Sequence, residues 1–356
     1  MTFGRNFLPG PTGVHPDVLA AMQEPMFPHY GHRMTEVLEE IQPSLRAVFG
    51  TSRPVFAVTS SGTGLLEGAI RGAVRHRVLV VTSGYFGEYF ARIAEHCGKD
   101  VVRVSVPLGR TLEADQLDQL LDGPRIDAVA LVHSESSTGA LAPLADLAAV
   151  VRKRPDVMLL VDGISSVGGL PIEMDRIGAD CIVTSSQKAL AIPPGLAFGA
   201  VSERLEARAR TIEDAGYYFN LARWTRMAAE HRVWETPALS QFMALVHQLR
   251  RVAAAGGWPA RWDRHAAMAA RCHAWAAGIP GVRLLAPEGR RSPTVSALTL
   301  TDRDPAQVAQ ALADQGYLVG QAVHPDQGPL IRIGHMGDLE PADLDRLLSA
   351  LEPLLS

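Results

Sequence analysis

Residues 157–166 read VMLLVDGISS and residues 180–188 read DCIVTSSQK, and these two stretches decide the fold class. Each starts with a continuous apolar run and ends in small polar residues, which is typical of a strand buried on both faces of a parallel sheet. Asp162 closes the first run and Lys188 follows the second. Because functional side chains collect at the carboxyl ends of such strands, an acid and an amine are expected at one edge of the sheet.

The same alternation of apolar runs and amphipathic segments extends from about residue 55 to about residue 200. The apolar runs predict strands over 54–61, 77–84, 100–107, 126–135, 157–166 and 180–188. The amphipathic segments predict helices over 64–74, 87–97, 114–122 and 142–154. Apolar strands separated by helices indicate an α/β fold, with a mostly parallel sheet covered by helices on both faces.

The last third of the chain has a different pattern. Residues 204–275 are mainly helical in pattern. Further strands are expected over 281–289, 294–301 and 330–335, and helices over 305–316 and 341–355. This mixture predicts a smaller C-terminal α+β domain. The expected division is a large domain over 13–250 and a small domain formed by 1–12 and 251–356.

Composition and charge exclude several classes of protein. The chain has 356 residues, of which 47% are hydrophobic and 20% charged, and this describes a globular protein with a sizeable core. The net charge of −4 gives no reason to expect a nucleic-acid partner. No apolar run approaches the ~18 residues that span a membrane, and the N-terminus lacks the apolar core of a signal peptide. A cytoplasmic protein without a membrane partner is therefore expected.

The three cysteines, Cys97, Cys181 and Cys272, are widely spaced and form no CxxC pair. This spacing argues against a disulfide framework and against a zinc knuckle, and it suits a reducing cytosol. No metal site is expected.

Asp162 and Lys188 are the first candidates for chemistry. A buried carboxylate is costly unless a cation or hydrogen-bond donors face it, although Asp162 could simply cap the next segment. A partly desolvated lysine has a lowered pKa and can attack carbonyl groups. The alternative, a solvated lysine, is disfavoured by the apolar ALAIPPGLAFG that follows. Residues 185–188 also fit the S-x-x-K signature of penicillin-binding enzymes, but the S-D-N and K-T-G elements are absent from the chain.

The stretch TSSGTGLLEGAI (59–70) is a candidate phosphate site. A strand, then small residues from Ser60 to Gly64, then a helix would bring backbone N–H groups, hydroxyls and a helix dipole to one anion. A plain turn remains the alternative. A dinucleotide fingerprint would need glycine at position 67, which is Glu67, so that motif fails.

Other polar or aromatic side chains also follow predicted strands. Tyr85 or Phe86 could stack on a flat ring, although aromatic residues there are more often part of the core. Arg332 lies in LIRIGHMG, and its rigid fork suits a carboxylate, although a surface arginine is the default. The segment LVHSESSTGAL adds a dense set of hydrogen-bonding groups, namely His133, Glu135, Ser136, Ser137 and Thr138. A phosphate cradle, an aromatic, an acid and an amine are what pyridoxal phosphate (PLP) requires.

Taken with these motifs, the sequence resembles the class V aminotransferases of the alanine–glyoxylate, serine–glyoxylate and serine–pyruvate type, which are PLP enzymes of fold type I. The resemblance runs from LPGPTGVHPDVLAAM through SSGTGLLEGAI, ESSTGALAPL and VDGISSVGG to IRIGHMGDL. The segment SSQKALAIPPGL is highly specific. The resemblance implies a seven-stranded sheet in the large domain, PLP as the cofactor, and a homodimer with shared active sites.

The resemblance also implies roles for individual residues. Lys188 would form the Schiff base with PLP, and Asp162 would keep the pyridine nitrogen protonated. Arg332 would bind the substrate carboxylate, with backbone near Gly10 closing over it. The implied cofactor ligands are Ser61, Gly62, Thr63 and Gln187 at the phosphate, Phe86 stacking on the ring, Ser136 or else Thr138 at the 3′-oxygen, Ile164 under the ring, and Thr236 at the phosphate of the neighbouring subunit.

The implied reaction is ping-pong transamination from alanine or serine to glyoxylate or pyruvate. Val233 stands where some relatives have tyrosine, and Tyr30 and His32 are candidates to face the substrate, so the donor remains open. One alternative is an aminotransferase for a specialised amine such as a ureido-amino acid or an aminophosphonate. Another is a PLP lyase or desulfurase, of which the desulfurase would need a reactive cysteine on a mobile loop. A catalytically silent scaffold has no need for Asp162, Lys188 and Arg332 together.

Overall fold

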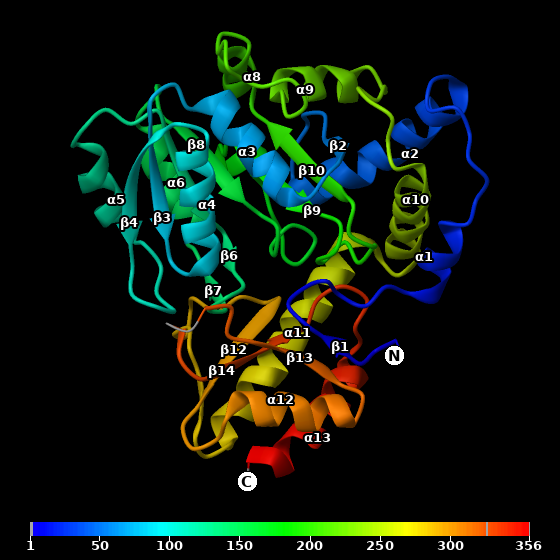
Figure 1. Ribbon diagram of the computed structural model, residues 1–356, viewed down its shortest axis with the longest axis vertical. Coiled ribbons are helices and arrows are strands. Elements are labelled where there is room, and N and C mark those ends of the chain that lie inside the picture. The colour runs from blue at the N-terminus through cyan, green and yellow to red at the C-terminus, as the bar shows by residue number, and fades with distance from the viewer. Residues whose placement is uncertain (1–2, 325–326, 356) are drawn as a thin grey trace.

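A seven-stranded sheet forms the centre of the computed structural model, which describes residues 3–324 and 327–355 (Figure 1). In spatial order its strands are β2 (Phe56–Thr59), β10 (Leu196–Val201), β9 (Cys181–Ser185), β8 (Met158–Asp162), β5 (Ala128–Val132), β3 (Arg77–Thr82) and β4 (Asp100–Ser105). Only β10 is antiparallel to its neighbours β2 and β9. The predicted α/β fold with a mostly parallel sheet is therefore confirmed.

Both faces of this sheet are apolar, because alternate residues of each strand enter two different cores. In β3, Leu79 and Val81 belong to one core while Val78 and Val80 belong to the other. The first core is closed by α1 (Pro16–Ala21), α2 (His32–Phe49), α5 (Ala114–Leu121), α6 (Leu144–Arg152), α7 (Met174–Ile177) and α10 (Leu239–Ala254). The second is closed by α3 (Gly62–Ala73), α4 (Tyr85–His96), α8 (Glu203–Ala209) and α9 (Leu221–Ala229).

A second, five-stranded sheet lies below the first in Figure 1. Its spatial order is β1 (Asn6–Phe7), β13 (Leu318–Gln321), β14 (Leu330–Gly334), β12 (Val295–Leu300) and β11 (Val282–Leu284). It shares a core with α11 (Gly257–Gly278), α12 (Pro305–Asp314) and α13 (Pro341–Leu355). Because β1 pairs with β13, the N-terminal segment is bound to this sheet before it passes to the large one.

Several elements were not expected from the sequence, among them the helices α1, α2 and α7 and the strands β1, β10 and β13. Pro43 lies inside α2 and interrupts the pattern from which a helix is recognised. Strand β10 follows β9 through the loop 186–195 rather than through a helix, and its apolar residues merge with the apolar second half of that loop. A short hairpin, β6 (Ser134–Glu135) and β7 (Ala140–Leu141), extends the chain beyond β5.

Candidate active site

A cavity of about 320 Å³ opens at the carboxyl ends of β5, β8 and β9. Ten residues predicted for the site line it: Gly10, Ser61, Gly62, Thr63, Phe86, Ser136, Asp162, Ile164, Gln187 and Lys188. The lining is completed by residues that were not predicted: Pro11, Leu66, Tyr89, Val132, Ser134, Ser165, Ser185 and Pro194. Asp162 at the end of β8 and Lys188 just after the neighbouring strand β9 therefore line the same cavity.

Lys188 is buried and is held by the N-terminal segment. Its Nζ donates a hydrogen bond to the carbonyl of Pro9, and the Thr12 hydroxyl donates to the Lys188 carbonyl over 3.1 Å. Burial lowers the pKa of Lys188 to about 8, and the positive charge of Arg332 acts in the same direction. A Cβ added to Gly10 would lie 2.6 Å from Lys188 Nζ, so only glycine permits this approach. An amine with this pKa is a competent nucleophile toward an aldehyde.

Asp162 is 4% exposed at the end of β8. Its Oδ1 accepts a hydrogen bond from the Ile164 N–H over 2.8 Å. Burial raises the pKa of Asp162 to about 7, while the positive charge of Lys188 opposes that rise. A carboxylate buried in this way is stabilised by a nearby cation, and the protonated ring nitrogen of PLP is such a cation.

The opposite end of the cavity suits a phosphate. Ser61 is the N-cap of α3, and its side chain makes no capping hydrogen bond, so the first N–H groups of the helix face the cavity without a side-chain acceptor. A Cβ on Gly62 would lie 2.5 Å from Ile164 Cδ1, so the bare backbone forms the cradle. The Ser185 hydroxyl lines the cavity, is fully buried and has no hydrogen-bond partner in the described part of the chain. The cavity thus fits PLP at both ends.

Two aromatic side chains from α4 reach the cavity. The Phe86 ring centroid lies 6.0 Å from Lys188 Nζ. Tyr89 lies three residues further along α4 and therefore on the same face of the helix. This i, i+3 spacing is the signal from which Tyr89 could have been found once Phe86 was a candidate.

Three predicted residues lie outside the lining. Arg332, on β14, is bonded to a lining residue: its Nη1 donates to the Ser136 carbonyl over 3.0 Å, and its Nε donates to the Gln321 carbonyl over 2.8 Å. Burial lowers the pKa of Arg332 to about 10. Tyr30 is 75% exposed and Thr236 is also exposed, so neither joins the cavity within one chain.

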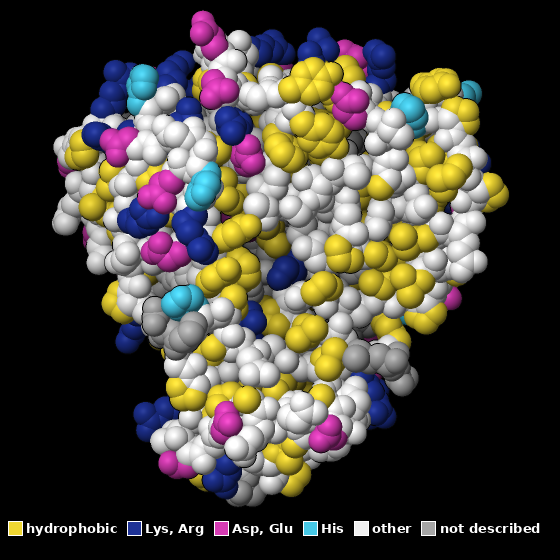
Figure 2. All heavy atoms as spheres, viewed as in Figure 1, with side chains coloured by type: hydrophobic (Ala, Val, Ile, Leu, Met, Phe, Trp, Pro, Cys, Tyr) yellow, Lys and Arg dark blue, Asp and Glu magenta, His cyan; other side chains and the backbone are white. Residues whose placement is uncertain are grey.

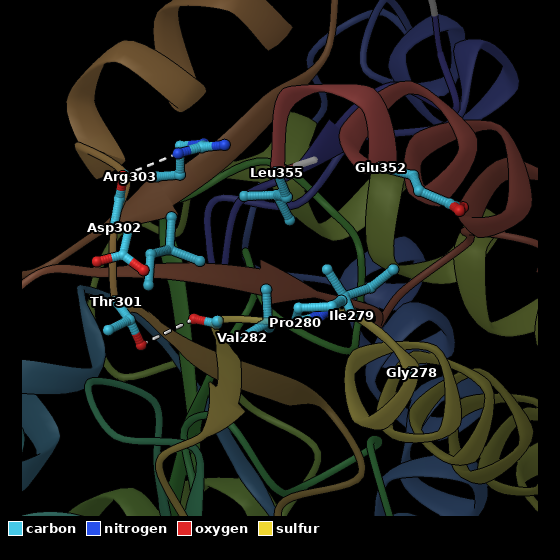
Figure 3. A pocket seen from close by; sticks show the side chains of 11 residues that line it. Gly278, Ile279, Pro280, Val282, Thr301, Asp302, Arg303, Glu352 and Leu355 are labelled. Carbon is cyan, nitrogen blue, oxygen red and sulfur yellow. Dashed lines mark hydrogen bonds between the residues drawn. The ribbon is translucent and has the colours of Figure 1, made fainter.

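A larger cavity of about 470 Å³ lies in the small sheet (Figure 3). It is bounded by Gly278–Val282, Leu300–Arg303, Glu352 and Leu355. Thr301 bonds back to the Gly281 carbonyl over 3.2 Å. The lining contains no residue predicted for the active site, so its volume does not make it the catalytic centre.

The fold and the first cavity together define a PLP enzyme of fold type I. The family model for class-V aminotransferases matches residues 6–327. An uncharacterized aminotransferase of Methanocaldococcus jannaschii is 33% identical over 93% of this chain and 87% of its own length. An L-aspartate–glyoxylate aminotransferase of Paracoccus denitrificans is 30% identical over 94% of this chain and 87% of its own length. The crystal structure of an alanine–glyoxylate aminotransferase from Nostoc sp. is 31% identical and superposes with a TM-score of 0.93, covering 100% of this chain and 96% of that one.

The chain belongs to the class-V aminotransferase family. It is accordingly a transaminase, and its cofactor is PLP. Among residues 3–324 and 327–355, the helices do not reach the length and apolarity needed to cross a membrane.

Proposed function

We propose that this enzyme transfers the amino group of a small amino acid, alanine or serine, to glyoxylate or pyruvate. The observation that carries the proposal is the cavity shared by Lys188 and Asp162, with Arg332 bonded to Ser136 in its lining. Two of the similar proteins are named for glyoxylate as a substrate, while their amino donors, L-aspartate and alanine, differ. Glyoxylate is therefore better supported as the acceptor than pyruvate. The choice of alanine or serine as the donor has less support, because the donors named for the similar proteins differ.

In the proposed site each residue has one task. Bound PLP supplies an electron sink for the carbanion that forms at the donor's Cα. Lys188 would hold the cofactor covalently and would move the proton from the donor's Cα, because an amine with a pKa of about 8 exchanges protons readily near neutral pH. Asp162 would hold a proton on the ring nitrogen. Arg332 would orient the substrate through its carboxylate, leaving Cα within reach of Lys188.

The remaining cofactor ligands follow from the lining of the cavity. Ser61, Gly62, Thr63 and Gln187 would bind the phosphate, Phe86 and Ile164 would enclose the ring, and Ser136 would contact the 3′-oxygen. Besides Arg332, the proposed substrate contacts are Gly10 and Tyr30.

The chain has three lysines, Lys99, Lys153 and Lys188, so the covalent assignment has a direct test. Borohydride reduction of the PLP-loaded enzyme, followed by peptide mass mapping, should put the label on Lys188 alone. Lys188→Ala should lose the visible absorption band, while Lys153→Ala, which removes only an exposed ion pair with Asp118, should keep it. A label on Lys99 or Lys153 would contradict the assignment.

The substrates are tested with a panel of amino donors against glyoxylate and pyruvate, with bleaching of the visible band as the readout. Alanine or serine with glyoxylate should give the highest kcat/KM. Faster turnover of a ureido-amino acid or an aminophosphonate would instead support the specialised-amine alternative. The desulfurase alternative is poorly supported, because all three cysteines are buried and burial raises the pKa of Cys272 to about 11. Release of ammonia or sulfide from a donor without an acceptor would instead support the lyase alternative.

We also propose a homodimer in which Thr236 reaches the partner's phosphate site. Thr236 is exposed, and apolar side chains gather over α1, α9 and α10 on the same side of the molecule (Figure 2). The large exposed hydrophobic side chains of the described residues include Leu19 on α1, Met26 and Tyr30 between α1 and α2, and Tyr217 shortly before α9. Lys188→Ala and Thr236→Glu should each be inactive alone, and refolding them together in equal amounts should restore about a quarter of wild-type activity. About half of the dimers are then mixed, and each mixed dimer contains one intact site out of two. No recovery in verified mixed dimers would contradict the shared site.

The division into a large domain over 13–250 and a small domain of 1–12 with 251–356 is likewise a proposal. It is supported by the pairing of β1 with β13 and by the break between α10 and α11. A cytoplasmic location is also proposed, and fractionation of the producing cells tests it.

A further inference from the structure

Next to the cavity, between the lining residues Ser134 and Ser136, lies a buried acid that the proposed reaction does not use. Glu135 ends β6 and is 1% exposed. Its Oε2 accepts a hydrogen bond from the Gly87 N–H over 3.0 Å. Its Oε1 accepts from the Ser137 N–H over 3.1 Å and from the Ser137 hydroxyl over 2.5 Å. Donors directed at both oxygens are an arrangement for a carboxylate.

These bonds fix the start of α4 and therefore Phe86. The N-cap of α4 is Gly84, which has no side chain to satisfy the first N–H groups of the helix. Glu135 binds the Gly87 N–H directly, and Ser137 Oγ accepts from the Tyr85 N–H over 3.0 Å. The two anchored N–H groups flank Phe86.

Gly84 permits this contact. A Cβ at this position would lie 2.7 Å from Glu135 Cγ and 2.5 Å from Ser137 Oγ. The start of α4 and the hairpin are therefore packed too closely for any side chain at residue 84. Glu135 thus acts as a capping group supplied from a distant part of the chain.

The same turn also holds the substrate side of the site. The Ser136 carbonyl accepts from Arg332 Nη1, and the Ser137 carbonyl accepts from Gln327 Nε2 over 3.1 Å. The turn after Glu135 therefore contacts the small sheet on one side and α4 on the other. A displacement of Glu135 would move the proposed stacking ring and the proposed carboxylate-binding arginine together.

Glu135 also acts through its charge. The charged groups that respond to it are Asp162 on β8, Lys188 after β9 and Arg332 on β14. Its negative charge raises the pKa of each of them. Burial raises the pKa of Glu135 itself, whereas its bonds with Ser137 and with the start of α4 favour the ionised form.

We propose that Glu135 is a positioning residue that orients Phe86 and Arg332 around the cofactor and keeps a negative charge beside Lys188. This inference rests on the proposed function, because it assumes that those three residues face cofactor and substrate. It adds a role for a residue that makes no direct contact with either.

The test compares Glu135→Gln, Glu135→Asp and Asp127→Asn in the PLP-loaded enzyme. Asp127 is a matched control, because it is also a buried carboxylate that accepts backbone bonds, from His76 and Arg77, but at the opposite end of β5. The readouts are the pH midpoint of the visible cofactor band, the dissociation constant of PLP and the thermal midpoint. None of these requires turnover.

Glu135→Gln removes the charge and sets an amide donor or an uncharged oxygen against the Gly87 N–H. The pH midpoint of the band should fall by at least about half a unit, and PLP should bind about tenfold more weakly. Glu135→Asp keeps the charge and shortens the reach, so it should keep the wild-type midpoint while binding PLP more weakly. Asp127→Asn should lower the thermal midpoint only.

An unchanged pH midpoint in Glu135→Gln, with a loss of stability like that of Asp127→Asn, would make Glu135 a structural residue and overturn the proposal. If Glu135→Gln does not fold, Ser137→Ala replaces it, because loss of the hydroxyl weakens the ionised form of Glu135 and should lower the midpoint in the same direction. Failure of the underlying function would be seen separately, as a Lys188→Ala enzyme that keeps the visible band.

Discussion

Asparagine in place of Asp162 is expected to slow transamination strongly and yet to stabilise the cofactor-free protein at alkaline pH. The folded protein holds a proton on Asp162 that the unfolded chain has already lost, because burial raises the pKa of this group from 3.8 to about 7. Stability therefore falls as pH rises through that window, and a shift of this size corresponds to at most about 4 kcal/mol. Asparagine keeps the acceptor for the Ile164 N–H and has no charge to bury.

The informative quantity is the change in unfolding free energy caused by the substitution, compared between two pH values. Effects of the substitution on packing are the same at both pH values and therefore cancel. The gain in unfolding free energy of Asp162→Asn over wild type should be about 2 kcal/mol larger at pH 8 than at pH 5.5. Urea unfolding of both cofactor-free proteins at the two pH values measures it. In the loaded enzyme, kcat should fall by about 10²–10⁴, as expected for loss of a group that stabilises the transition state. An equal effect of the substitution at both pH values, or activity within tenfold of wild type, would refute the reasoning.

Three further outcomes are expected. Gly10→Ala should lower kcat by about tenfold or more because its Cβ would meet Lys188, whereas Gly289→Ala should affect stability only, since Gly289 also has a positive φ (77° against 125°) but no atom within 4 Å of an added Cβ; equal activity losses would contradict this. Arg332→Lys should raise KM for both substrates about 10- to 100-fold with little change in PLP affinity, since the fork is lost, and a normal KM would exclude Arg332 from substrate binding. Ser185→Ala should weaken PLP binding about 3- to 10-fold in a fluorescence titration without lowering the thermal midpoint, because its buried hydroxyl has no partner among the described residues; an unchanged affinity would remove Ser185 from the cofactor site.

Much of the site could be predicted because its residues follow local patterns. Each of Asp162, Lys188 and Phe86 comes after an apolar run, and in a parallel sheet the ends of such runs meet at one edge. The glycine-rich start of α3 is recognisable for the same reason, since the strand, the turn and the helix are consecutive. Strand β10 escaped recognition because no helix separates it from β9 and the residues just before it, 189–195, are mostly apolar. The antiparallel pairing is a property of the folded sheet.

The contacts between distant segments could not be predicted. Lys188 is bound by Pro9 across 179 residues of sequence, and Arg332 by Ser136 across 196. In both cases the acceptor is a backbone carbonyl, which every residue has, so no sequence pattern marks Pro9 or Ser136 as the partner. Glu135 reads as one more polar residue after a strand until its carboxylate is seen at the start of α4.

The α/β class, the residue types at the strand ends and the likeness to class-V aminotransferases could be predicted from local patterns, because hydrophobic periodicity and short motifs involve neighbouring residues. The folded chain was needed to see that the N-terminal segment contacts Lys188 and that the hairpin after β5 bonds both to Arg332 and to the N–H groups on either side of Phe86. It was also needed to see that Ser185 has no hydrogen-bond partner among the described residues. These are consequences of long-range packing, in which the burial of apolar surface brings remote segments together and the polar groups they carry then find, or lack, a partner.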